Sequence, residues 1–66
     1  MNVLLNGEPR TLSGSRTLQT LIDELGLTGK RLAVEVNEDI VPRSQHHDYR
    51  LQDGDRIEIV HAIGGG

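Results

Sequence analysis

An amphipathic helix pattern between residues 17 and 26 constrains the fold of this chain more than any other feature. Its apolar positions follow the i, i+3, i+4, i+7 spacing of one helix face, at Leu18, Leu21, Ile22 and Leu25. Thr17 can accept a hydrogen bond from the first turn, and Gly26 suits the left-handed position that ends a helix. A chain of 66 residues has room for a single core. One helix with one apolar stripe must therefore cover one face of one sheet.

A hairpin is predicted at the start of the chain. Asn6-Gly7 is a strong signal for a two-residue turn, because both residues tolerate a positive φ, and it separates residues 1–5 from residues 8–12. Alternation of side chains places Val3 on the core face and Leu4 on the opposite face. Pro9 cannot donate a hydrogen bond to a neighbouring strand, so the second strand is expected at an edge of the sheet.

Three further strands are predicted after the helix, over residues 32–36, 40–41 and 56–61. Pro42 stops the short middle one, and residues 37–39 and 52–55 are typical of turns. A polar, irregular segment over residues 43–50 precedes Leu51, which we expect in the core. The sequence therefore predicts an α+β fold, with a mixed sheet of four to five strands and one helix packed on one face.

This order of elements, with a last strand that leads into glycines, resembles the ubiquitin-like β-grasp family. Within that family the chain is similar to the bacterial sulfur carrier proteins of thiamin biosynthesis, and the resemblance covers its whole length. The motifs that carry it are Val3-Leu4-Leu5-Asn6-Gly7, Thr17-Leu18-Gln19-Thr20-Leu21-Ile22, Ala33-Val34-Glu35-Val36-Asn37, Ile40-Val41-Pro42-Arg43, Asp53-Gly54-Asp55 and Gly65-Gly66. Gly64 departs from the usual glycine pair. The resemblance implies a β-grasp domain over residues 1–63 and a flexible glycine tail over residues 64–66.

The resemblance also implies that the working group is the C-terminal carboxylate of Gly66. The chain is then a carrier and co-substrate of partner enzymes, and not an enzyme itself. In the family, an E1-like activating enzyme uses ATP and Mg²⁺ to adenylate this carboxylate, so no cofactor is expected on the carrier. Sulfur from a cysteine desulfurase or a relay protein then displaces AMP and leaves a thiocarboxylate. Thiazole synthase uses that sulfur to build the thiazole ring of thiamin.

The three last glycines suit such a role physically. Gly64, Gly65 and Gly66 have no β-carbon, so this segment can thread a narrow channel. Extended chain rises by up to about 3.3–3.6 Å per residue, so residues 63–66 reach roughly 10–14 Å beyond the domain. That length is enough to place Gly66 inside a partner while the folded body docks outside.

A docking surface is predicted on the face of the sheet that the helix leaves open. Leu4 and Val60 are expected to point onto this face, and the family places the first and last strands side by side. The two residues are therefore predicted to form one apolar patch near the tail, which would mark a partner-binding site. Arg56 and Glu58 are predicted to flank the patch and to set the register of the partner electrostatically.

Composition argues against several other roles. A single aromatic residue, Tyr49, and a net charge of −3 argue against a nucleic-acid partner. The absence of cysteine excludes a thiolate nucleophile and a zinc–thiolate site. His46 and His47 are expected in a solvated loop and pointing opposite ways, so no metal site is predicted. No membrane span or signal peptide is recognised, so we expect a cytoplasmic protein that is monomeric when free.

Three alternatives stay open at this point. The small subunit of molybdopterin synthase uses the same terminal thiocarboxylate, although such subunits tend to be longer. A ubiquitin-like protein modifier would join its terminus to lysines. A β-grasp binding module with an inert tail would use only its folded surface.

Overall fold

The structure is a computed structural model that describes residues 1–14 and 16–61. The predictions for the glycine tail, residues 64–66, therefore lie outside the described residues. The elements in chain order are β1 (Asn2–Leu5), β2 (Glu8–Thr11), α1 (Leu18–Glu24), β3 (Leu32–Val36), β4 (Asp39–Ile40), the 3₁₀ helix η1 (Arg43–Gln45) and β5 (Arg56–His61).

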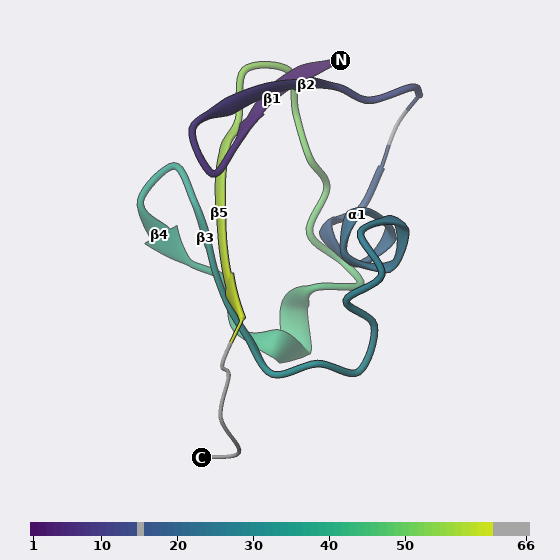
Figure 1. Ribbon diagram of the computed structural model, residues 1–66, viewed down its shortest axis with the longest axis vertical. Helices are drawn as coiled ribbons and strands as arrows, with labels where there is room; N and C mark the ends of the chain where they lie inside the picture. Colours follow the sequence, from purple (N-terminus) through teal and green to yellow (C-terminus); the bar gives the residue numbers. More distant parts are fainter. Residues whose placement is uncertain (15, 62–66) are drawn as a thin grey trace.

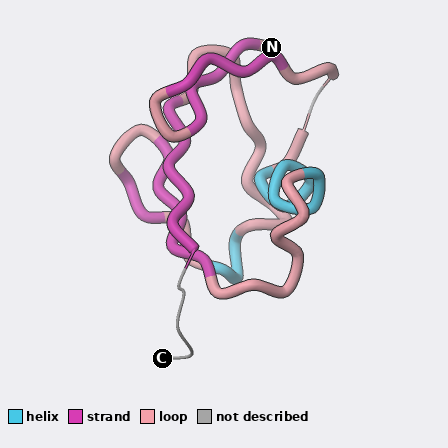
Figure 2. Tube along the Cα trace, viewed as in Figure 1, coloured by secondary structure: helices cyan, strands magenta, loops and turns pink. Residues whose placement is uncertain are grey.

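The strands form one five-stranded sheet in the order β2-β1-β5-β3-β4. β1 and β5 are parallel, whereas β1–β2, β3–β4 and β3–β5 are antiparallel, so the sheet is mixed. Figures 1 and 2 show α1 on one side of this sheet, with η1 and the loop after α1 at the end of the molecule where β5 ends. The predicted α+β architecture of one helix on one mixed sheet is confirmed.

The first hairpin forms as its turn residues predict. Asn6 and Gly7 have φ angles of 51° and 82°, the positive values that a type I′ turn requires. Pro9 pairs with Leu4, and β2 is the outermost strand, so its missing N–H faces no further strand.

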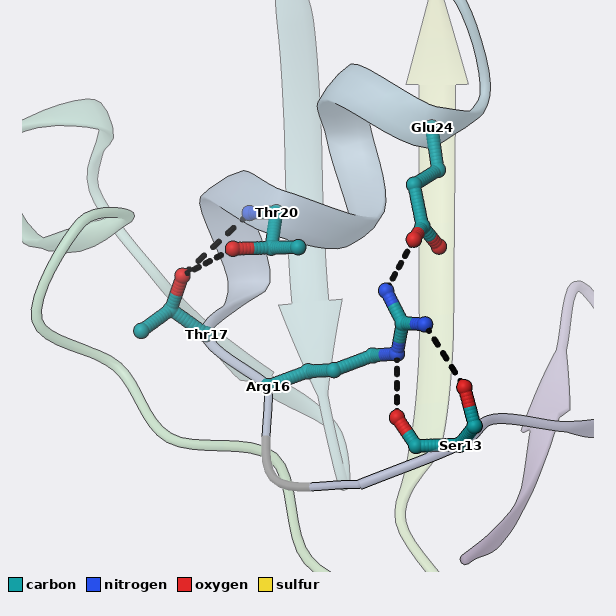
Figure 3. Close-up of polar contacts among 5 residues, drawn as sticks. All are labelled: Ser13, Arg16, Thr17, Thr20 and Glu24. Atoms are coloured by element: carbon teal, nitrogen blue, oxygen red, sulfur yellow. Dashed lines mark hydrogen bonds and ion pairs between the residues drawn. The ribbon is translucent and has the colours of Figure 1, made fainter.

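The helix begins and ends where the sequence predicts. The Thr17 hydroxyl accepts a hydrogen bond from the Thr20 N–H at 3.2 Å, which caps the first turn. Arg16 links the preceding loop to the last turn, because its guanidinium donates to Glu24 and to the Ser13 carbonyl and hydroxyl (Figure 3). Gly26 follows the helix with a φ of 76°, the left-handed value expected after a C-cap.

The core lies between α1 and the sheet. It consists of buried apolar side chains from the helix stripe, the inner face of the strands and two loop positions: Val3, Leu12, Leu18, Leu21, Ile22, Val34, Val36, Val41, Leu51, Ile57 and Ile59. Leu51 lies in this core as expected. Leu25 is partly buried and packs against it.

The short strand lies one residue earlier than predicted. The turn before it uses only Asn37 and Glu38, both with positive φ (53° and 74°), so Asp39 already pairs with Val36. Ile40 then faces outward with 78% of its surface exposed, and Val41 turns into the core. The prediction of a strand at residues 40–41 was therefore wrong by one residue. The sequence predicted a three-residue turn over residues 37–39, whereas the turn has two residues and contains no glycine.

His46 is also placed differently from the prediction. We expected a solvated loop, but the side chain of His46 is only 4% exposed. Its Nε2 lies 3.0 Å from the Val41 carbonyl oxygen. A carbonyl can only accept a hydrogen bond, so Nε2 carries the proton and donates it. His47, in contrast, is exposed.

Side chains fix the point where β5 begins. Asp55 is only 8% exposed, and its carboxylate accepts hydrogen bonds from the Gln52 N–H at 2.8 Å and the Asn37 amide at 3.0 Å. The Asn37 side chain in turn accepts from the Arg56 N–H at 3.0 Å. The turn between β3 and β4 is thereby tied to the first residue of β5.

The side chain of Asn6 fixes the other half of β5. The paired residues of β1 and β5 end at Leu5 and Ile57. Beyond them, Asn6 Oδ1 accepts from the Ile59 N–H at 2.8 Å, and Asn6 Nδ2 donates to the Ile59 carbonyl at 3.3 Å. The side-chain amide of Asn6 therefore pairs with β5 in the place where one more residue of β1 would have paired.

Replacing Asn6 tests this role. Asn6→Gly keeps the positive φ accessible but removes both side-chain bonds to Ile59, so it should lower the free energy of unfolding by about 1–2 kcal/mol. Asn6→Ala should cost more, because alanine also disfavours the left-handed backbone. Urea unfolding followed by circular dichroism measures both values. An Asn6→Gly variant as stable as the parent would show that the amide does not support β5.

Candidate functional site

The face of the sheet opposite α1 is called the open face here. It is defined by outward positions that alternate with buried residues along three adjacent strands. These positions are Leu4 on β1, Arg56, Glu58 and Val60 on β5, and Ala33 and Glu35 on β3. All six are exposed, so no part of the described chain covers this face.

Leu4 and Val60 both lie on the open face, as predicted, with 38% and 65% of their surfaces exposed. They are not neighbours, however. Leu4 pairs with Arg56 at the beginning of β5, and Val60 pairs with Ala33 near its end. Four residues along a strand correspond to roughly 13 Å. The prediction of one apolar patch was therefore wrong, because the parallel register places β1 beside the beginning of β5 only.

Arg56 and Glu58 lie between these two apolar positions. Leu4, Arg56 and Glu58 line a hollow of about 270 Å³, together with Asn6, Gly7 and Ile57. The hollow has an apolar side chain next to one cation and one anion. Such a surface suits the side chain of a partner protein, with the two charges available to orient it.

The pairing of Glu35 with Glu58 was not predicted. The two carboxylate residues are direct partners in the β3–β5 register and both are exposed. The ion pair found among the described residues, between Arg16 and Glu24, involves neither of them. Like charges directly opposite each other destabilise a sheet. The available signal was the repeated pattern Val34-Glu35-Val36 and Ile57-Glu58-Ile59, but only the register brings the two together.

In the part of the chain that the structure describes, two groups have shifted pKa values, and neither lies on the open face. Hydrogen bonds from Thr28 and Gln19 to the Asp23 carboxylate lower the pKa of Asp23. Burial raises the pKa of Tyr49. Over residues 1–14 and 16–61, no three metal-binding side chains gather in one place. Within the same ranges, no helix has the length and apolar character that crossing a bilayer requires.

The predicted carrying residue, Gly66, is not tested by the structure. The last described residue is His61, which pairs with Leu32 at the end of β5. β5 is the middle strand of the sheet, with β1 on one side and β3 on the other. The segment that contains Gly64, Gly65 and Gly66 thus follows directly from the best-supported strand.

Comparison with known proteins decides the family. Residues 3–66 match the ThiS family over nearly the whole chain. The chain belongs to the ThiS family. The sulfur carrier protein ThiS of Thermus thermophilus is 42% identical over 64 residues, which cover 97% of this chain and 98% of that protein. The ThiS of Escherichia coli is 32% identical over the full length of both chains.

The fold comparison agrees with the sequence comparison. The crystal structure of a thiamine biosynthesis protein (ThiS) from Geobacter metallireducens superposes with a TM-score of 0.84, at 30% identity and with both chains fully covered. The β-grasp fold and the family predicted from the sequence are confirmed. The Thermus and E. coli relatives are both named sulfur carrier proteins, which agrees with the predicted function.

A second kind of relative is much longer. The thiazole synthase of Paramagnetospirillum magneticum is 46% identical over 66 residues, which cover all of this chain. These residues make up 20% of that protein, and the same share holds for the thiazole synthase of Magnetococcus marinus. The chain therefore spans about a fifth of the length of the thiazole synthases that it matches.

The pair of glutamates generates a stability prediction. Glu35→Gln should raise the free energy of unfolding by about 0.2–1 kcal/mol at low salt, because it removes the repulsion from Glu58. The gain should shrink as salt screens the two charges. The matched control is Glu8→Gln, which makes the same charge change on the edge strand β2, opposite Leu5. An equal effect of the two substitutions would mean that net charge, and not the pair, is responsible.

Proposed function

We propose that this chain carries sulfur for thiazole formation in thiamin biosynthesis, as a thiocarboxylate on Gly66. The observation that carries the proposal is the match with the E. coli ThiS, which covers every residue of both chains and so includes Gly66. The shared β-grasp fold of the Geobacter protein supports it.

The chemistry follows from the weakness of a carboxylate as an electrophile. An E1-like enzyme joins the Gly66 carboxylate to the α-phosphate of Mg²⁺-bound ATP and releases pyrophosphate. The acyl-adenylate has AMP as a leaving group. The outer sulfur of a persulfide on a cysteine desulfurase or a relay protein then attacks the carbonyl carbon and displaces AMP, which gives an acyl disulfide. A second thiol reduces this disulfide, so that the sulfur stays on Gly66 and the two thiols are left joined as a disulfide. The thiocarboxylate that results donates its sulfur to thiazole synthase. ATP and Mg²⁺ belong to the activating enzyme in this scheme, and the carrier is a co-substrate.

The folded domain contributes the docking surface. Five residues follow His61 in the sequence, and extended chain spans at most about 18 Å over that length. A partner whose reaction centre receives Gly66 must therefore contact the domain close to the end of β5. Val60 and Ala33 are the open-face residues nearest that point, since they pair one position before His61 and Leu32.

The charges of the open face define what the partner should present. Glu35 and Glu58 leave two adjacent carboxylates without a cation from the described residues. A lysine or arginine from the partner would pair with both and remove their repulsion on binding. Arg56, beside Leu4, is available for an acidic group of the same partner.

The proposal of thiazole synthase as a partner rests on the longer relatives. Two proteins of that name contain a segment similar to the whole of this chain. Such a segment within one polypeptide supports a working contact between the carrier domain and the synthase.

Intact-protein mass spectrometry tests the carrier chemistry. The chain is incubated with ATP, Mg²⁺, the adenylating enzyme of its own host, a cysteine desulfurase and cysteine. We expect a species heavier by the difference between a sulfur and an oxygen atom, localised to Gly66 by fragmentation. A variant without Gly65 and Gly66 should stay unmodified and keep its stability, since over residues 1–14 and 16–61 the core ends at Ile59.

The same mixture separates the alternatives. The E. coli ThiS serves as a positive control for loading with its own adenylating enzyme. Persistence of the free carboxylate in this chain alone would favour an inert binding module. Adducts on lysine residues would indicate a protein modifier. A loaded chain that supports molybdopterin formation but not thiazole formation would move it to the other pathway.

A substitution on the open face tests the docking surface. Val60→Asp should raise the concentration of carrier needed for half-maximal loading about 10-fold, because it places a charge where the partner is expected to bury an apolar side chain. Its effect on stability should be small, since Val60 is 65% exposed. Thr20→Asp adds the same charge to the exposed side of α1 and should load normally. Equal loading of the two variants would show that the end of β5 is not a contact.

A further inference from the structure

A polar cavity lies at the end of the molecule where β5 ends. It opens between α1, the loop that follows α1, and η1, and its volume is about 40 Å³. Its polar lining consists of Gln19 from α1, Lys30 from the loop, and Arg43 and His46 at η1. Leu32, which also lines the cavity, pairs with His61. Figure 1 shows the loop after α1 and η1 beside the end of β5.

The charge of this cavity is opposite to that of the whole chain. The net charge of the chain is −3, yet two cationic residues, Lys30 and Arg43, border one small cavity. Neither side chain makes a hydrogen bond or an ion pair with another described residue. Asp23 is an acidic residue that is hydrogen-bonded to one of the residues lining the cavity, Gln19. Its Oδ1 atom already accepts from Gln19 at 2.8 Å and from Thr28 at 2.7 Å.

The wall of the cavity is held rigidly. The His46 carbonyl accepts a hydrogen bond from the Gln19 N–H at 2.9 Å, which ties η1 to the first turn of α1. The buried His46 ring donates to the Val41 carbonyl at 3.0 Å, which ties the same residue to the segment after β4. The backbone around His46 does not need to reorganise before a ligand binds, so the ordering cost is confined to the exposed side chains of Lys30 and Arg43.

The dimensions select the class of ligand. A cavity volume of about 10–15 Å³ on this measure is enough for one water molecule, so a cavity of about 40 Å³ admits a small group such as a carboxylate. A nucleotide or a sugar phosphate is several times larger. The guanidinium of Arg43 can donate two parallel hydrogen bonds to a carboxylate, and the Lys30 ammonium adds a third donor.

We propose that this cavity, the Arg43 cavity, binds the side-chain carboxylate of an aspartate or glutamate on a partner protein. Arg43 and Lys30 are its cationic ligands. The position beside the end of β5 makes it a second contact for the enzyme that receives Gly66. The identity of that partner rests on the proposed function, whereas the affinity for a carboxylate is a property of this chain alone.

A titration of the isolated chain tests the carboxylate site directly. Amide shifts of ¹⁵N-labelled protein are recorded with sodium acetate, with inorganic phosphate and with sodium chloride at equal ionic strength. We expect saturable shifts with acetate at Gly29, Lys30 and His46. Arg43→Gln should weaken acetate binding at least 5-fold. Arg10→Gln, which removes a cation from β2, should leave it unchanged.

Three results would overturn the proposal. Acetate shifts that match those with chloride, or that persist in Arg43→Gln, would show that the cavity is not a carboxylate site. Tighter saturable binding of phosphate than of acetate would assign the cavity to a phosphate group. Equal thermal unfolding midpoints of Arg43→Gln and the parent establish that the variant is folded.

A loading assay then tests the partner. The double variant with Lys30→Gln and Arg43→Gln should need about 10-fold more carrier for half-maximal thiocarboxylate formation, at an unchanged maximal rate, while Arg10→Gln behaves as the parent. Normal loading of the double variant would overturn the partner contact. A parent chain that is never loaded would count against the proposed function, and the acetate titration would still decide the cavity.

Discussion

The parallel pairing of β1 with β5 is the contact on which the rest of the structure depends. Parallel neighbours cannot be joined by a tight turn, so the chain must leave the sheet and return between them. The excursion contains α1, which covers one face and buries its apolar stripe against Val34, Val36, Ile57 and Ile59. The described residues leave the other face open. One pairing thus determines which side of the sheet supplies stability and which side is available to partners.

The same pairing makes β5 the middle strand, and side chains secure it at both ends. Asp55 and Asn37 hold its first residue in place, and the amide of Asn6 continues the ladder beside Ile59 after β1 has ended. These bonds join positions that are far apart in sequence. A small domain has little apolar surface to bury. Polar anchors of this kind therefore matter for keeping the strand that leads to the glycine segment firmly placed.

What the sequence could predict follows from what is local. The helix stripe, its Thr17 cap, the Asn6-Gly7 turn and the alternation along β1, β3 and β5 depend on neighbours within a few residues, and all are confirmed. The family resemblance also rests on short motifs. The separation of Leu4 from Val60 and the contact of Glu35 with Glu58 depend on register between strands, which a single sequence does not specify. The burial of His46 depends on how η1 packs under α1. Gly66 is named by the resemblance and lies outside the described residues.

Two pairs of charged residues that have no ion-pair partner within the described residues differ in sign. The open face carries two adjacent carboxylates, whereas the Arg43 cavity carries two cations at the end of β5. A partner that supplies a cation to the first and an anion to the second gains both contacts at once. A protein with the reverse pattern is repelled at both, and unfavourable contacts of this type contribute to specificity as much as favourable ones. Since the glycine segment has no side chains with which to be recognised, discrimination between partners must come from the folded surface. Two oppositely charged contacts at separate positions fix the orientation of the domain in a way that one apolar patch could not.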